Sequence, residues 1–263
     1  MAKLAANLTM LYTEVDVMDR FAKAADAGFT HVEMLFPYDY DLDQVERELK
    51  ANGLSMILFD THAGDWAAGD RGYLCDPSQK ERFYQSVKDG IVVAQRLGTG
   101  LLNALAGKIP AGVSFEQARA TVVENLRKAA PLCEDAGITL VTEGLNSIQT
   151  PGFFLDSSKL GFEIVDEVGS PAVKFQYDIY HMQIMEGNLI DTIKANVEKI
   201  AHIQVADVPG RHEPGTGEIN YPNVLKAIDE SGYQGYVALE YAPAGDTQAG
   251  LDAWLPREQR AVR

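Results

Sequence analysis

The segment Val173-Lys-Phe-Gln-Tyr-Asp-Ile-Tyr-His-Met182 combines a strand pattern with two side chains that often carry chemistry. Apolar and polar residues alternate from Val173 to Asp178, which is typical of a short β-strand ending in a carboxylate. His181 follows three residues later, in what we expect to be a loop. A carboxylate and an imidazole at the carboxyl end of one strand predict a functional site at that edge of a sheet.

The rest of the chain repeats one unit, in which an amphipathic stretch ends in glycine and a short apolar run follows. For example, Phe83, Val87 and Ile91 share one face of a predicted helix, and Gly98 precedes the run Leu101–Leu105. Helical periodicity followed by a short apolar run is typical of βα units. The predicted strands are Leu4–Leu8, His31–Leu35, Leu54–Phe59, Leu101–Leu105, Ile138–Glu143, Val173–Asp178, His202–Val205 and Gly235–Glu240, and Thr247–Leu255 is the last predicted helix.

These alternating units predict an α/β fold, a single (β/α)8 TIM barrel that spans residues 1–263 as one domain. A doubly wound open sheet is the alternative, but it should carry a glycine-rich turn where Asn7-Leu-Thr-Met10 stands. Pro131 lies inside the fourth helical pattern and is expected to kink or shorten that helix. The loops Ala63–Pro77 and Asp207–Pro222 are long, and on a barrel they lie at the catalytic face.

Composition limits the class of protein. The formal net charge of −15 argues against a nucleic-acid partner, because a phosphate backbone is bound by a positive field. No apolar run reaches about 18 residues, so no transmembrane helix is expected, and no signal peptide is evident. Cys75 and Cys133 fit a reducing cytoplasm without a structural disulfide. The sequence leaves open whether the chain forms a homo-oligomer.

Four neighbouring strands are predicted to end in an oxygen-bearing side chain: Glu143, Asp178, Gln204 and Glu240. In a barrel these side chains point into the mouth of the active site. Three carboxylates and one amide oxygen suit one divalent cation such as Mg²⁺ or Mn²⁺ better than zinc. His181 would lie over this metal face and donate a hydrogen bond to a substrate oxygen. His202 shares the strand face of Gln204, so we expect it to contact Gln204 without touching the substrate. Core packing is the alternative role for His202.

These residues give the chain its resemblance to a known family. Glu143, the segment Asp178-Ile-Tyr-His181, Gln204, Glu240 and the run Glu213-Pro-Gly-Thr-Gly-Glu-Ile-Asn-Tyr221 resemble the hydroxypyruvate isomerase family of xylose-isomerase-like barrels. The segments Ala63-Gly-Asp-Trp-Ala-Ala-Gly-Asp-Arg-Gly72 and Phe36-Pro-Tyr-Asp-Tyr40 also match, so the resemblance covers nearly the whole chain. One departure is His62, where the family usually carries proline.

The resemblance implies that Glu143, Asp178, Gln204 and Glu240 hold the metal and that Glu143 and Glu240 are the catalytic pair. The expected reaction converts hydroxypyruvate into 2-hydroxy-3-oxopropanoate through an enediolate, which a metal stabilises while the two glutamates take and return a proton. A hydride shift is the competing mechanism, and it generally uses a second metal. The same motifs fit the family's 2-oxo-tetronate isomerases equally well.

A small acid substrate also needs a cation for its carboxylate. Arg211 and Arg71 in the two long loops, and Lys108 after the fourth strand, are the candidates, with plain surface charge as the alternative for each. Three rival functions remain. A ketose 3-epimerase usually carries histidine where Gln204 stands. An apurinic endonuclease needs several zinc ions, many histidines and a basic face. A non-enzymatic sugar-binding barrel would bind its ligand without metal.

Overall fold

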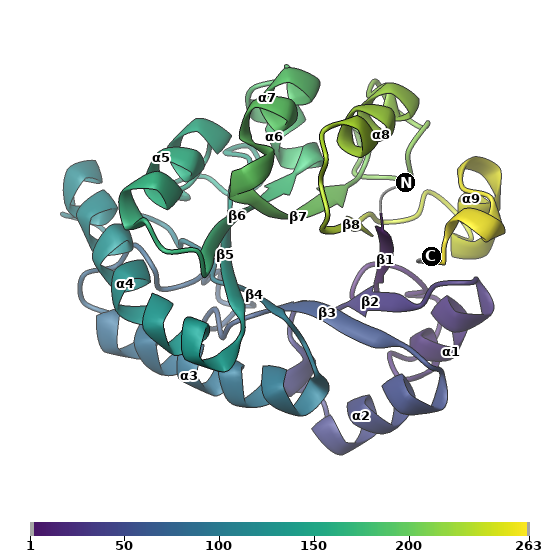
Figure 1. Ribbon diagram of the computed structural model, residues 1–263, viewed down its shortest axis with the longest axis horizontal. Coiled ribbons are helices and arrows are strands. Elements are labelled where there is room, and N and C mark those ends of the chain that lie inside the picture. Colours follow the sequence, from purple (N-terminus) through teal and green to yellow (C-terminus); the bar gives the residue numbers. More distant parts are fainter. Residues whose placement is uncertain (1–2, 262–263) are drawn as a thin grey trace.

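The computed structural model describes residues 3–261 as a closed barrel of eight parallel strands. Each strand pairs with the next along the chain, and β8 pairs with β1 to close the ring. In Figure 1 the strands form the inner ring and the helices lie outside it. The predicted (β/α)8 fold is therefore confirmed. The strands are β1 (Lys3–Asn7), β2 (His31–Glu33), β3 (Ser55–Asp60), β4 (Leu101–Asn103), β5 (Thr139–Glu143), β6 (Val173–Asp178), β7 (Ile200–Val205) and β8 (Tyr236–Leu239).

Helices alternate with these strands. The α-helices are α1 (Asp19–Asp26), α2 (Leu42–Ala51), α3 (Lys80–Leu97), α4 (Phe115–Ala136), α5 (Ser158–Val168), α6 (Ile179–Met185), α7 (Leu189–Asn196), α8 (Tyr221–Glu230) and α9 (Thr247–Trp254). The short 3₁₀ helices are η1 (Pro37–Asp39), η2 (Val197–Lys199) and η3 (Arg257–Gln259). All predicted strands are present, with ends within two residues of those expected.

Two local predictions differ from the structure, one of them only in part. His181 was expected in a loop, but it lies in the first turn of α6, because the Asp178 carboxylate caps that helix by accepting from the backbone N–H of Tyr180. Pro131 was expected to kink or shorten its helix, and the helix is not shortened, because α4 continues to Ala136. Pro131 is exposed, so water can satisfy the carbonyl that loses its helical partner, while the opposite face of α4 stays buried against the core.

Side chains inside the barrel form layers because residues two apart on a strand share a face. Several strands carry a small or apolar residue two positions before a polar strand end: Ala5 before Asn7, Leu58 before Asp60, Val141 before Glu143 and Ala238 before Glu240. These four belong to one buried apolar cluster. Gln176 and His202 occupy the equivalent positions on β6 and β7. The polar strand ends therefore form a layer above a mainly apolar one.

The long loop between β7 and α8 is organised by one buried carboxylate. Asp207 accepts hydrogen bonds from the backbone N–H groups of Val208, Gly215, Gly217 and Ile219, at 2.8 to 3.1 Å. Glycine is required at Gly217, since a Cβ there would lie 2.1 Å from the carbonyl oxygen of Val208. This scaffold holds the part of the loop that carries Arg211 in a fixed place.

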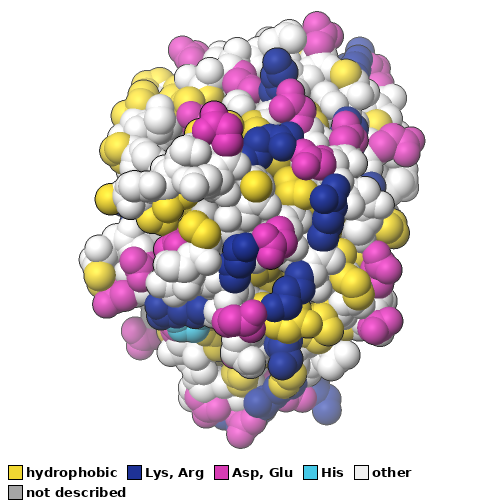
Figure 2. All heavy atoms as spheres, turned by 90° about the vertical axis from the view of Figure 1, so that its left-hand side faces the viewer, with side chains coloured by type: hydrophobic (Ala, Val, Ile, Leu, Met, Phe, Trp, Pro, Cys, Tyr) yellow, Lys and Arg dark blue, Asp and Glu magenta, His cyan; other side chains and the backbone are white. Residues whose placement is uncertain are grey.

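The outer surface is a mixture of charges. Figure 2 views the side of the molecule formed around α3, α4 and α5, where acidic and basic side chains are interspersed. Ion pairs such as Lys80–Glu124 and Arg119–Glu167 connect neighbouring helices on this side. Within residues 3–261, no helix combines the length and the apolar character needed to cross a membrane. Cys75 and Cys133 are both buried free thiols, as expected.

Candidate active site

Every strand carries a buried polar side chain at its carboxyl end or within one residue of it. In chain order these are Asn7, Glu33, Asp60, Asn103, Glu143, Asp178, Gln204 and Glu240. The last four were predicted from the sequence, and the first four were missed. Each of the missed residues is the last residue of its strand. The strands predicted around Glu33 and Asn103 were two residues too long, which placed these two side chains within a strand instead of at its end.

A cavity of about 370 Å³ opens at these strand ends. The predicted site residues that line it are Glu143, Gln204, Glu240, His181, Arg211 and Arg71. Asp60 and Gln176 also line it and were not predicted. Asp178 is 1% exposed and does not line the cavity. The volume is typical of a small-molecule site.

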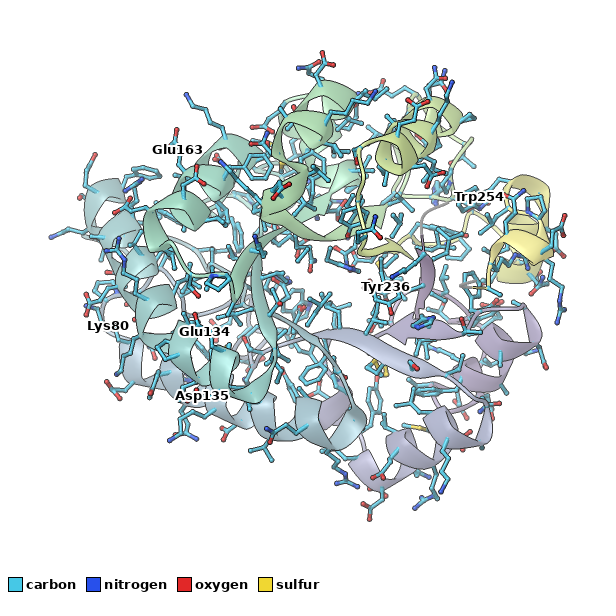
Figure 3. The ribbon with its side chains drawn as sticks, in the orientation of Figure 1. Lys80, Glu134, Asp135, Glu163, Tyr236 and Trp254 are labelled. Atoms are coloured by element: carbon cyan, nitrogen blue, oxygen red, sulfur yellow. The ribbon has the colours of Figure 1, made fainter. Side chains whose placement is uncertain are left out.

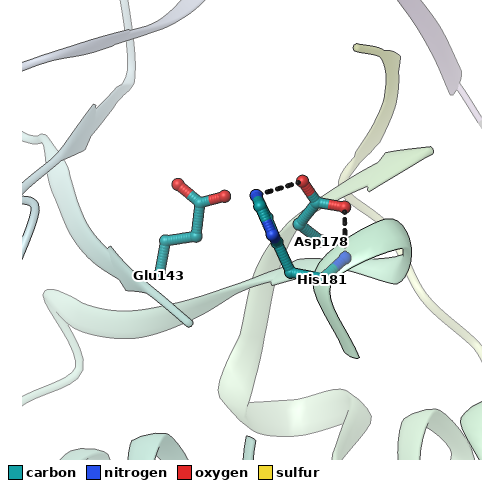
Figure 4. A group of neighbouring side chains, drawn as sticks. All are labelled: Glu143, Asp178 and His181. Atoms are coloured by element: carbon teal, nitrogen blue, oxygen red, sulfur yellow. Dashed lines mark hydrogen bonds and ion pairs between the residues drawn. The ribbon is translucent and has the colours of Figure 1, made fainter. Parts of the chain in front are cut away.

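Glu143, Asp178 and His181 converge beside this cavity, with one ligand-type atom of each within 4.8 Å of the others (Figure 4). The His181 Nδ1 atom accepts a hydrogen bond from the backbone N–H of Asn146 at 3.1 Å. Burial lowers the pKa of His181 to about 4, although Asp178 opposes this shift. The ring is therefore neutral at pH 7 with its proton on Nε2, which lies 3.5 Å from Asp178 Oδ2. His181 thus presents a donor N–H and no free ligand atom.

Arg211 places a positive charge against the same carboxylates. Its Nη2 donates a hydrogen bond to Glu240 Oε2 and lies 3.4 Å from Asp178 Oδ2. The guanidinium carbon lies 5.2 Å from the centre of the Tyr180 ring. Burial disfavours the charge, but Glu240 and Asp178 outweigh it and raise the pKa of Arg211. Arg211 is therefore a counter-ion of this carboxylate cluster.

Three carboxyl groups of the site, those of Glu143, Glu240 and Asp60, are costly to ionise because they are buried. Burial, followed by the charges of Glu240 and Asp178, raises the pKa of Glu143 well above its usual value. Burial also raises the pKa of Glu240 to about 8, although Arg211 lowers it. The pKa of Asp60 is raised well above its usual value by burial, and a hydrogen bond from Asn103 opposes the shift. Pairs of buried acids with raised pKa values are typical of catalytic sites.

Two asparagines link these acids in the same way. Asn103 Nδ2 donates to Asp60 Oδ1 and to Glu143 Oε2, both at 3.1 Å. Asn7 Nδ2 donates to Glu33 Oε1 at 2.8 Å and to Glu240 Oε1 at 3.3 Å. Each glutamate of the predicted catalytic pair is therefore held by an asparagine amide that also holds a second buried carboxyl group. These contacts fix the positions of both glutamates at the cavity wall.

Gln204 belongs to a further buried network beneath the cavity. Its Nε2 donates to Glu33 Oε1 at 2.8 Å, and its Oε1 accepts from Gln176 Nε2 at 2.7 Å. His202 is completely buried, and its Nε2 lies 2.7 Å from Glu33 Oε2. Among the described residues, His202 Nδ1 has no hydrogen-bond partner. His202 is thus placed behind Gln204, where it contacts Glu33.

The three candidate substrate cations occupy different surroundings. Arg211 and Arg71 both line the cavity, and the Arg71 guanidinium lies 3.8 Å from the centre of the Trp66 ring. Lys108 is exposed and is not part of the cavity wall. His62 also lies outside the wall, where its ring stacks on Tyr38 at 5.6 Å. The geometry therefore places Arg71 and Arg211, and not Lys108, next to the cavity.

The donor set fits a hard divalent cation. Glu143, Asp178 and Glu240 supply carboxylate oxygens, and the Gln204 carbonyl oxygen keeps one lone pair beside the hydrogen bond from Gln176. Burial raises the pKa values of Glu143 and Glu240, and neighbouring carboxylates add to both shifts, so a bound cation would favour their charged forms. A guanidinium already bridges Asp178 and Glu240, so the cluster attracts a cation. The donor set of the site therefore fits a divalent cation.

Comparison with known proteins identifies related barrels. The family model for the xylose isomerase-like TIM barrel matches residues 21–258. Hydroxypyruvate isomerase of Escherichia coli (strain K12) is 47% identical over 97% of this chain and 98% of its own length. 2-Oxo-tetronate isomerase of Cupriavidus necator is 42% identical over the same shares. A solved crystal structure of a Brucella melitensis protein named AP endonuclease, family 2, is 40% identical, with a TM-score of 0.94 and coverage of 97% and 99%.

Proposed function

The chain belongs to the hydroxypyruvate isomerase family of xylose isomerase-like TIM barrels, and on that basis we propose that it isomerises hydroxypyruvate to 2-hydroxy-3-oxopropanoate. More generally, the chain is an isomerase of small oxo acids, because its relatives are named hydroxypyruvate isomerase and 2-oxo-tetronate isomerase. The observation that carries the proposal is the pair of buried glutamates, Glu143 and Glu240, which line one cavity from β5 and from the end of β8.

Moving a carbonyl to the neighbouring carbon requires one proton to leave C3 of hydroxypyruvate and one to arrive at C2, while the hydroxyl proton moves from the C3 oxygen to the C2 oxygen. We infer that Glu143 and Glu240 carry these protons, since both are buried carboxyl groups that reach the cavity from different strands. Asn103 and Asn7 hold the two carboxyl groups in place. The Nε2–H of His181 is available to a substrate oxygen at the cavity wall, which stabilises the charge of the enediolate.

Glu143, Asp178, Gln204 and Glu240 are proposed to hold one divalent ion, Mg²⁺ or Mn²⁺. When bound, such an ion supplies Lewis-acid stabilisation of the enediolate. Arg211 and Arg71 are the groups that can pair with the substrate carboxylate, because both line the cavity. The two buried free thiols fit a reaction carried out in the reducing cytoplasm.

A four-carbon oxo acid is the nearest second candidate, because a relative named 2-oxo-tetronate isomerase is 42% identical to the chain. The cavity of about 370 Å³ accommodates either acid. An endonuclease, which is the name given to the Brucella protein, needs a positive surface for DNA. The net charge of −15 argues against that function here, and so does a cavity in which His181 is the single histidine among the described lining residues.

The test is proton NMR of the metal-stripped, full-length protein with hydroxypyruvate in deuterated water, before and after Mg²⁺ or Mn²⁺ is added. We expect product only with metal, and deuterium at the carbon that receives the proton. Product without metal would refute the metal requirement. Product without deuterium would favour a hydride shift or a transferred proton that is shielded from solvent. No turnover of hydroxypyruvate, with turnover of 2-dehydrotetronate, would move the assignment to the four-carbon acid.

A further inference from the structure

We propose that Glu33 is a positioning residue that fixes the side-chain amide of Gln204, so that the oxygen and not the nitrogen faces the metal site. This inference rests on the proposed function, because it takes Gln204 as a ligand. Glu33 is completely buried at the end of β2 and does not line the cavity, so it does not touch a substrate. Its influence must pass through the side chains it contacts.

Asn7 shows that Glu33 Oε1 is a hydrogen-bond acceptor. The Asn7 side-chain oxygen accepts from the backbone N–H groups of Thr9 and Met10, at 2.9 and 3.1 Å. Because its oxygen is committed to the backbone, Asn7 must turn its NH₂ group toward Glu33, where Nδ2 lies 2.8 Å from Oε1. The Glu33 oxygen at this contact therefore has no role as a donor.

Gln204 contacts the same oxygen. Gln204 Nε2 donates to Glu33 Oε1 at 2.8 Å, and on the other side Gln204 Oε1 accepts from Gln176 Nε2 at 2.7 Å. If the amide were turned over, its oxygen would face an acceptor at Glu33 and its NH₂ group would face a donor at Gln176. The contact with Glu33 would become repulsive. Gln176 could turn its own amide to match, because its Oε1 has no hydrogen-bond partner among the described residues. Glu33 is therefore the contact that allows one orientation.

The orientation matters because only one end of an amide can bind a cation. The Gln204 oxygen carries a second lone pair beyond the one used by Gln176, and Gln204 lines the cavity. An NH₂ group has no lone pair to offer a divalent ion and would repel it. The glutamate that lies behind the cavity therefore decides whether Gln204 can serve as a ligand. Partners behind a metal ligand typically change metal affinity about 10- to 100-fold.

Three variants separate the effect of the Gln204 amide orientation on Mn²⁺ binding from the effects of charge and of folding. E33M keeps a similar volume but removes the acceptor, and we expect it to bind Mn²⁺ about 10- to 100-fold more weakly. E33Q loses the charge but keeps an acceptor oxygen for Asn7 and Gln204, so its affinity should stay close to that of wild type. In E33M/Q204E the residue at position 204 is a carboxylate, which presents oxygen in either orientation, and Mn²⁺ binding should return.

The measurement is electron paramagnetic resonance of free Mn²⁺ over the metal-stripped, full-length protein, with circular dichroism to confirm folding. E163M is the matched control, because Glu163 is exposed on the outer side of α5 (Figure 3). Wild-type affinity in E33M would overturn the inference. Weak binding by folded E33Q, or no recovery in folded E33M/Q204E, would assign the effect to charge or to general structure and would also overturn it. If E33M does not fold, E33Q and E33M/Q204E decide the question by the same criteria.

The behaviour of the wild-type protein distinguishes a failure of this inference from a failure of the proposed function. If wild type binds Mn²⁺ and turns over an oxo acid while E33M binds the ion equally well, only the role of Glu33 is refuted. If wild type does not bind Mn²⁺, the proposed metal site fails, and the role of Glu33 fails with it.

Discussion

Arg211 donates a hydrogen bond to Glu240, and the same nitrogen atom lies 3.4 Å from Asp178 Oδ2. A side chain from the long β7–α8 loop therefore supplies positive charge to two carboxylates that we assign to the metal site. The contact has a cost, because the Arg211 Nε atom is buried without a hydrogen-bond partner among the described residues. The guanidinium and a divalent ion would compete for the same oxygens.

This contact leads to a prediction about stability. R211A leaves Asp178 and Glu240 buried without their cation, so metal-free R211A should unfold at a lower temperature than wild type at pH 8. Adding Mn²⁺ should raise the unfolding temperature of R211A more than that of wild type, because the ion supplies the missing charge. Thermal unfolding with and without Mn²⁺ measures both effects. R47A is the control, since Arg47 is exposed on α2, and an equal Mn²⁺ shift in R211A and wild type would contradict the argument.

A second prediction compares two cations near the cavity. Arg71 lines the cavity and Lys108 does not, so R71A should raise KM for the oxo acid while K108A leaves it unchanged. A hydrogen bond to a charged group contributes about 1.5–3 kcal/mol, so KM should rise roughly tenfold or more. Steady-state kinetics on both variants give the answer. An equal rise in both would mean that the effect is a general loss of positive charge.

Asp60 provides a prediction about pH. Burial raises its folded-state pKa above the value in the unfolded chain, so the folded state holds a proton that the unfolded state has lost. The free energy of unfolding then falls as pH rises above the unfolded pKa. D60N removes this titration, so its stability relative to wild type should increase between pH 4 and pH 8. Chemical denaturation of the metal-free proteins tests this, with D26N as an exposed control. A difference that does not change with pH would rule out a proton held by Asp60.

The sequence predicted the barrel well because each βα unit repeats the same local signals. Helix faces, capping glycines and short apolar runs all lie within about 30 residues of one another, and the closed ring follows from their number. The four residues from Glu143 to Glu240 were found because they stand at or next to the carboxyl ends of strands, and these ends were predicted within about a residue. Glu33 and Asn103 were missed because their strands stop at three residues, and apolar residues continue beyond them.

Other features of the site depend on contacts between distant parts of the chain. The pairing of Arg211 with Asp178 and Glu240 requires the loop that Asp207 organises, and nothing near Arg211 in the sequence indicates its partners. The same holds for Glu33 and Gln204, which are 171 residues apart. The neutral state of His181 follows from its burial and from the backbone of Asn146. Such properties come from packing, which residue patterns do not specify.

The last prediction concerns which of Glu143 and Glu240 removes the C3 proton and which returns a proton at C2. E143Q and E240Q each keep an oxygen for a metal but cannot carry a proton, so kcat should fall about 10²- to 10⁴-fold in both. If one glutamate removes the C3 proton and the other returns it at C2, the two variants should still differ in one respect. The variant that keeps the C3 base should exchange hydroxypyruvate protons with deuterated water without forming product, and the other should do neither. Proton NMR measures exchange and product together, and Mn²⁺ binding by both variants is the control. Equal exchange in both variants would mean that a single group, or water, carries the proton at both carbons.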